Sequence, residues 1–164
     1  LAMIPIMKKN PAPTVLIAGE TTKSHEGFVN ELKEKIQNEG LEDRILFLGK
    51  IHYDDEVPKL MRGLSIVAAL STIEGFGLPV LEAMSSGCAV IASKTGAWED
   101  IIEEDVHGKL VPCNDTNSAH EALMNLTSKA HQLEQMGLKG RERIKNHFTI
   151  KSEAESLQIG RAHV

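Results

Sequence analysis

Short apolar runs alternate along this chain with longer segments that carry apolar residues on one helical face. The runs predict strands at Thr14–Ala18, Ile45–Leu48, Ile66–Ala69, Ala89–Ala92 and Lys109–Val111. The longer segments predict helices over residues 24–38, 54–61, from 79 onward, 116–128 and 130–146. Strands separated by helices pair in parallel, and runs that are apolar throughout are typical of strands covered on both faces. The pattern predicts an α/β domain with a doubly wound parallel sheet.

Several residues mark where these elements begin and end. Ser24 is predicted to be the N-cap of the helix that Gly40 stops, and Pro79 suits a first helical turn. Residues 1–7 resemble the end of an apolar-faced helix whose beginning is missing.

Glycines and small polar residues follow the predicted strands. They are Gly19, Gly49, residues 71–77 and residues 93–96. Doubly wound sheets bind ligands at the carboxyl ends of their strands. We therefore expect these segments to share one rim of the sheet, where a ligand lies.

The most informative of these segments is the sequence EGFGLPVLEA at residues 74–83. It follows a strand, contains two glycines and leads into a helix, with Glu74 and Glu82 eight positions apart. Such a loop presents free backbone N–H groups and the positive end of a helix to an anionic ligand.

Composition narrows the possible functions. The chain has 164 residues, of which 41% are hydrophobic, so it is long enough for one domain with a real core. A net charge of −5 argues against general binding to nucleic acid or anionic membranes. One Trp, one Tyr and four Phe leave little for a base-stacking surface. No apolar run approaches the roughly 20 residues that span a bilayer.

Cysteines and histidines give no sign of a metal site. Cys88 and Cys113 are isolated, and we expect both to be small buried hydrophobic side chains. The seven histidines include no pair at i and i+4 with a glutamate between them. We expect neither a metal nor a cofactor. The acidic run formed by residues 99–100 and 103–105 is expected on a solvated face.

The ordered motifs resemble those of the donor-binding half of GT-B fold retaining glycosyltransferases, family 4. The resemblance rests on EGFGLP and EAM at residues 74–84, Gly87 and AVIAS at 89–93, LIAGE at 16–20, ILFLG at 45–49, Gly96 with Glu99, and GKLVP at 108–112. It covers about residues 1–150 and implies a Rossmann-like fold whose first strand is missing. Leu70, Ala89, Ala97 and Ile150 depart from the family pattern, which leaves the identity of the sugar open.

The resemblance implies roles for the glycine loop. Glu74 would contact hydroxyls of the donor sugar, and the backbone N–H groups of Phe76, Gly77 and Leu78 would bind sugar or phosphate oxygens. Glu82 would accept hydrogen bonds from both ribose hydroxyls. Considered alone, Glu82 could simply favour a helix N-terminus, and Glu74 could be a solvated loop residue.

Two further binding residues come from the first half of the chain. Gly19 follows the first strand at the rim. Ile51 would pack near the nucleotide base, with Lys50 and Tyr53 nearby. Ile51 could equally be a plain core residue at the end of a strand.

The implied reaction is transfer of a hexose from a nucleotide diphosphate sugar, a GDP- or UDP-hexose, to a glycan or glycolipid acceptor with retention. In the family, an Arg and a Lys after the first strand neutralise the leaving diphosphate, and a second domain binds the acceptor. Both are expected to be absent here, so this fragment should bind a donor weakly and catalyse nothing. A GT-B-fold sugar-nucleotide epimerase and a noncatalytic nucleotide-sugar binding module are the alternatives.

The resemblance also suggests where the protein acts and how the chain is divided. A role in the synthesis of cell-surface polysaccharide or lipopolysaccharide implies a cytoplasmic protein with peripheral contact to the inner face of the plasma membrane. The basic residues at 139, 141, 143 and 145 either suit the C-terminal end of a helix or touch that membrane. We expect a donor domain over residues 1–150 and the start of a helix at 151–158. Residues 159–164 match the translation of a common sequencing adapter, so we expect a non-native tail.

Overall fold

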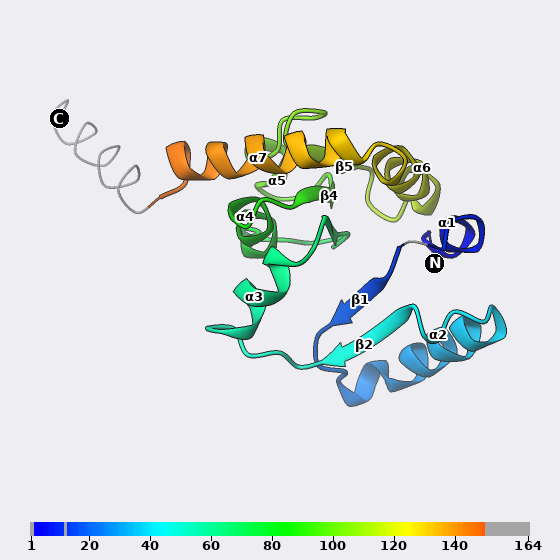
Figure 1. The fold of residues 1–164 in the computed structure, drawn as a ribbon. Coiled ribbons are helices and arrows are strands. Elements are labelled where there is room, and N and C mark those ends of the chain that lie inside the picture. The colour runs from blue at the N-terminus through cyan, green and yellow to red at the C-terminus, as the bar shows by residue number, and fades with distance from the viewer. Residues whose placement is uncertain (1, 12, 150–164) are drawn as a thin grey trace, which may run out of the picture. The chain divides into compact units, whose positions relative to one another are not determined.

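The computed structural model describes residues 2–11 and 13–149 (Figure 1). These residues form two compact units, one that ends at Val57 and one that begins at Pro58. The helix expected at 151–158 and the tail expected at 159–164 lie outside the described residues.

The first unit builds a small core around two parallel strands. Its elements are α1 (Ile4–Lys9), β1 (Val15–Ala18), the 3-10 turn η1 (Lys23–His25), α2 (Glu26–Asn38) and β2 (Ile45–Gly49). β1 pairs with β2 in register Val15↔Ile45. Apolar residues of both helices, of the connection from α2 to β2 and of β2 form the core, namely Ile4, Met7, Ile36, Leu41 and Ile45. The Arg44 guanidinium donates to the backbone oxygens of Met7, Asn10 and Pro13, each at 2.8 Å, and so ties α1 to the start of β1.

The start of α2 differs from the sequence expectation. The helix begins at Glu26 with His25 at the N-cap position, and His25 makes no side-chain capping bond. The Ser24 hydroxyl instead lies 3.2 Å from His25 Nδ1 within the 3-10 turn. The prediction that Ser24 is the N-cap of this helix is therefore wrong, because local side-chain contacts favour a tighter turn before the helix.

The second unit holds the other strands. They are β3 (Ile66–Ala69), β4 (Ala89–Ser93) and β5 (Gly108–Val111), and the helices are α3 (Glu56–Arg62), which starts in the first unit, α4 (Leu78–Ser85), α5 (Trp98–Ile101), α6 (Thr116–Thr127) and α7 (Ala130–His147). The sheet order is β3-β4-β5, and both pairs are parallel. Parallel strands with intervening helices confirm the predicted Rossmann-like α/β class.

β4 is the centre of the second core. All five of its residues are buried, as predicted for a strand covered on both faces. Val90 and Ala92 belong to a cluster with apolar residues of α4, α5 and α7, and α7 runs alongside α4 and β4 (Figure 1). In β1, β2 and β3 most positions are half-buried or exposed, so the expectation of full coverage is wrong for them in this structure.

The two cysteines differ in their surroundings. Cys88 is fully buried, and its thiol donates to the Met61 carbonyl oxygen at 3.0 Å, which joins the end of α3 to the start of β4. Burial raises the pKa of the Cys88 thiol to about 11. Cys113 is only half-buried, so the prediction of two buried cysteines is correct for Cys88 alone.

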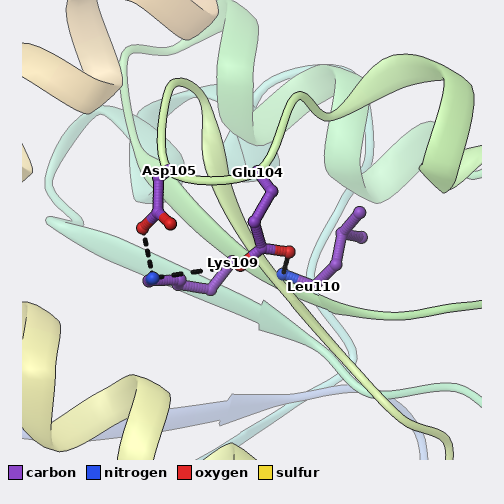
Figure 2. A network of polar contacts seen from close by, with 4 residues as sticks. All are labelled: Glu104, Asp105, Lys109 and Leu110. Carbon is purple, nitrogen blue, oxygen red and sulfur yellow. Dashed lines mark hydrogen bonds and ion pairs between the residues drawn. The ribbon is translucent and has the colours of Figure 1, made fainter.

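The acidic run before β5 is exposed, as expected, and a basic side chain compensates part of its charge. Figure 2 shows the Lys109 ammonium between the carboxylates of Asp105 and Glu104. The second oxygen of Glu104 accepts a hydrogen bond from the Leu110 backbone N–H at 3.1 Å. Asp105 has a φ of +65°, a left-handed conformation that Asp tolerates in turns. These contacts close the turn that leads into β5.

Candidate functional site

The glycine loop between β3 and α4 ends at a left-handed residue. Gly77 has φ +81° and ψ +41° and occupies the N-cap position of α4, followed by Leu78 and Pro79 in the first turn. The Gly77 carbonyl accepts from the Val80 N–H at 3.0 Å. A first helical turn leaves backbone N–H groups without partners inside the helix, so this end of α4 can bind an anion.

The side chains of the loop residues are mostly turned to solvent. Phe76 is 62% exposed and Leu78 is 51% exposed. Gly77, by contrast, is buried. The loop thus offers its backbone at a partly enclosed position, between two exposed apolar side chains.

The two glutamates of the motif lie on either side of this backbone. Glu74 precedes it and is half-buried, and one of its carboxylate oxygens accepts from the Gly75 N–H at 3.1 Å. Glu82 is also half-buried and lies one turn into α4. The Cα–Cβ bonds of a helix tilt toward its N-terminus, so Glu82 has its Cβ directed toward the glycine loop.

The loop after β4 packs on the glycine loop. A Cβ on Gly96, which has φ +56°, would lie 2.4 Å from the Glu74 carbonyl oxygen. The Thr95 hydroxyl donates to the Thr72 carbonyl oxygen at 3.4 Å. These contacts confirm that the carboxyl ends of β3 and β4 bring their loops together. Ala97 adopts φ −79°, so the departure from the family's glycine introduces no backbone strain there.

In the first unit, the ends of β1 and β2 meet in the same way. The Gly19 N–H donates to the Gly49 carbonyl oxygen at 2.8 Å. The residue after each of these glycines extends this contact, because Lys50 Nζ lies 3.5 Å from a carboxylate oxygen of Glu20. Ile51 follows and is half-buried. Gly19 and Ile51 therefore belong to the first unit, whereas Glu74 to Glu82 belong to the second.

Trp98 is a residue of this region that the sequence patterns did not single out. It begins α5, a helix of four residues that is too short to show a period. Its side chain is fully buried, and a Cβ on Gly77 would lie 1.8 Å from the indole Nε1. The signal that could have found it is its place just after the β4 loop, at the rim where ligands bind.

No group of three or more His, Cys, Asp or Glu side chains in residues 2–11 and 13–149 is arranged to hold a metal ion. Within the same ranges, no helix is long and apolar enough to cross a membrane.

The family described as glycosyl transferases group 1 matches residues 1–143. The chain belongs to this family. It is 30% identical over 158 residues to the lipopolysaccharide core biosynthesis mannosyltransferase LpsB of Rhizobium meliloti, a match that covers 95% of this chain and 44% of LpsB. The chain therefore spans less than half the length of this curated relative.

Solved structures of known proteins have the same fold. The C-terminal domain of a glycosyl transferase group 1 family protein, LpcC of Francisella tularensis, superposes with a TM-score of 0.86 at 38% identity, covering 91% of this chain and 76% of that one. HepE of Anabaena, solved in complex with UDP, superposes with a TM-score of 0.85 at 23% identity, covering 99% of this chain and 44% of HepE. The chain has the fold of the C-terminal domain of GT-B glycosyltransferases.

Proposed function

We propose that this chain is the donor-binding domain of a retaining hexosyltransferase. Its donor is a nucleotide diphosphate sugar, and its acceptor is a glycan or glycolipid of cell-surface polysaccharide or lipopolysaccharide. One observation carries the proposal: a left-handed Gly77 caps α4 between two half-buried glutamates. The likeness to a lipopolysaccharide core mannosyltransferase supports the choice of a hexose and of this class of acceptor.

Each part of the loop has a chemical task in this proposal. The carboxylate of Glu82 accepts hydrogen bonds from two ribose hydroxyls, and that of Glu74 accepts from hydroxyls of the sugar. The N–H groups of Phe76, Gly77 and Leu78 donate to phosphate and sugar oxygens.

The same loop acts in the chemical step. As the bond from sugar to phosphate breaks, positive charge grows on the sugar ring and negative charge on the departing diphosphate. Preorganised N–H dipoles at the start of α4 stabilise that negative charge. Gly19 and Ile51, at the ends of β1 and β2, are the donor-binding residues that we propose for the first unit.

A binding experiment would identify the nucleotide of the donor. LpcC was solved as an isolated C-terminal domain, so the present chain is a reasonable subject for calorimetry. UDP-glucose, GDP-mannose and ADP-glucose are titrated in turn, and we expect saturable binding of one UDP or GDP sugar. Absence of binding to all three would contradict a donor site.

Catalysis is tested on the complete product of the gene that encodes this chain. Transfer of radiolabelled sugar to a glycan or glycolipid acceptor is expected, and the anomeric configuration of the product should equal that of the donor. An inverted product would refute retention. Interconversion of free nucleotide sugars would indicate an epimerase, and donor binding without transfer would indicate a binding module.

We also propose that the protein works in the cytoplasm with peripheral contact to the inner face of the plasma membrane. The likeness to LpsB, a relative named for lipopolysaccharide core biosynthesis, supports this location. On α7, Lys139, Arg141 and Lys145 are exposed, so they could meet anionic lipid. Arg143 is occupied inside the protein, where its guanidinium donates to the Ile101 carbonyl oxygen.

A further inference from the structure

The indole of Trp98 occupies the space that a side chain at position 77 would need. A Cβ built on Gly77 would lie 1.8 Å from Nε1 and 2.4 Å from Cδ1 of the ring, far inside van der Waals contact. The five-membered ring therefore lies directly against the Gly77 backbone, on the residue that sets the start of α4.

The indole also leaves a polar group unsatisfied. Nε1 of Trp98 is buried and has no hydrogen-bond partner within the described part of the chain. Buried polar groups are usually paired, and an unpaired one is costly. A phenyl ring would fill apolar space here without this cost. The orientation of the ring is therefore set by packing against Gly77, not by a hydrogen bond.

The segment that carries Trp98 is anchored from the far side. α5 has only four residues, too few to be stable alone. Arg143 of α7 donates from Nε to the Ile101 carbonyl oxygen at 2.6 Å and from Nη2 to the Asp100 carbonyl oxygen at 2.8 Å. These two bonds hold the last turn of α5, and the apolar cluster around β4 holds the ring itself.

The same segment supports the glycine loop at a second point. The Gly96 backbone lies against the carbonyl groups of Glu74 and Gly75. The loop is thus fixed at both ends, by Gly96 near Glu74 and by Trp98 at Gly77. Between them lie the backbone groups that the proposed function assigns to the donor.

We propose that Trp98 is a positioning residue of the donor site. Glycine adopts left-handed and right-handed conformations about equally readily, so the sequence of the loop does not by itself hold Gly77 at φ +81°. The indole excludes the alternative paths of the backbone and keeps the N–H groups of Phe76, Gly77 and Leu78 directed at phosphate and sugar oxygens. This inference rests on the proposed function, because it concerns how that donor is held.

The decisive variant is Trp98→Phe, with Ile102→Val as the matched control. Ile102 belongs to the same buried cluster, so its truncation weakens the core but leaves the indole against Gly77. By calorimetry, we expect Trp98→Phe to raise the dissociation constant of the nucleotide sugar about tenfold, a factor that corresponds to the cost of fixing one residue's backbone again. Ile102→Val should leave the dissociation constant unchanged. Equal dissociation constants in the wild type and a folded Trp98→Phe variant would overturn the proposal.

The wild-type protein supplies a second measurement that needs no variant. Trp98 is the only tryptophan of the chain, so its fluorescence reports on this loop alone. A donor held by the loop should change the emission saturably, with the dissociation constant found by calorimetry. Calorimetric binding without any change in emission would also overturn the proposal.

Kinetics separate positioning from general destabilisation. In the complete gene product, Trp98→Phe should raise KM for the donor about tenfold and leave KM for the acceptor unchanged. A proportional rise in both KM values would indicate a merely structural role. If the wild type binds no nucleotide sugar at all, the proposed function fails rather than the role of Trp98.

Discussion

The backbone of Gly137 in α7 lies directly on the carbonyl oxygen of Gly87, the residue that turns the chain from α4 into β4. A Cβ on Gly137 would be 1.9 Å from that oxygen. One turn along the same helix, a Cβ on Gly140 would meet Met84 Cγ at 3.5 Å, which is ordinary contact. The close approach of α7 to the core therefore depends on Gly137 and not on Gly140.

We expect Gly137→Ala and Gly140→Ala to change stability in opposite directions. Alanine favours a helix over glycine by up to about 1 kcal/mol, so Gly140→Ala should be neutral or stabilising. Gly137→Ala gains the same propensity but forces α7 away from Gly87, at a cost of about 1–3 kcal/mol. Urea unfolding of the two variants and the wild type checks this. Equal stabilities of the two variants would contradict the close contact.

A second glycine pair separates backbone strain from a steric clash. Gly77 and Gly40 both have left-handed φ angles, +81° and +66°, but a Cβ on Gly40 would have open space. Gly40→Ala should cost about 1–2 kcal/mol from conformation alone. Gly77→Ala should cost a further 1–3 kcal/mol or so because of the clash with Trp98. Thermal unfolding gives the stabilities, and we expect calorimetry to show loss of nucleotide-sugar binding for Gly77→Ala only.

The two glutamates should differ in which part of the donor they recognise. Glu82→Gln is expected to weaken binding of both the nucleoside diphosphate and the nucleotide sugar, because both carry the ribose. Glu74→Gln should weaken only the nucleotide sugar. A hydrogen bond to a charged group contributes about 1.5–3 kcal/mol, which predicts losses of about ten- to a hundredfold. Parallel titrations with the diphosphate and its sugar give the comparison, and identical profiles for the two variants would refute the separate roles.

His107 should make the stability of the second unit fall in acid. Its side chain is 6% exposed, and its Nδ1 accepts from the Glu103 backbone N–H at 3.2 Å. Burial, and next the positive charge of Arg143, lower the pKa of His107 below its ordinary value of 6.5, while Glu103 opposes and Lys139 adds to this shift.

The sign of the effect follows from proton binding. With a lowered pKa in the folded state, the unfolded chain binds more protons below pH 6.5. Stability is therefore full above that pH and is lost as the pH falls toward the folded-state pKa. His107→Gln keeps a hydrogen-bond acceptor but does not titrate, so its melting temperature should depend less on pH between 5 and 7. An unchanged pH dependence would contradict this account.

Many of these features could be predicted from the sequence because their causes are local. Short apolar runs separated by helix-length segments were enough to predict β1 to β5 and their parallel pairing. Gly77 followed by Pro79 predicted where α4 begins. In each case neighbouring residues supply both the pattern and the physical reason. The prediction that Ser24 caps α2 failed, because the competing contacts of His25 are as local as the capping bond and form a turn instead.

The sequence by itself determined the order of the elements, the doubly wound class and the position of the glycine loop between Glu74 and Glu82. The tertiary structure alone decided that Trp98 supports Gly77, that Arg143 holds α5, and that Gly137 rather than Gly140 sets the approach of α7. These contacts join residues far apart in the chain and leave no period in the sequence. They depend on which atoms meet once the strands and helices have packed, and that is a property of the folded core.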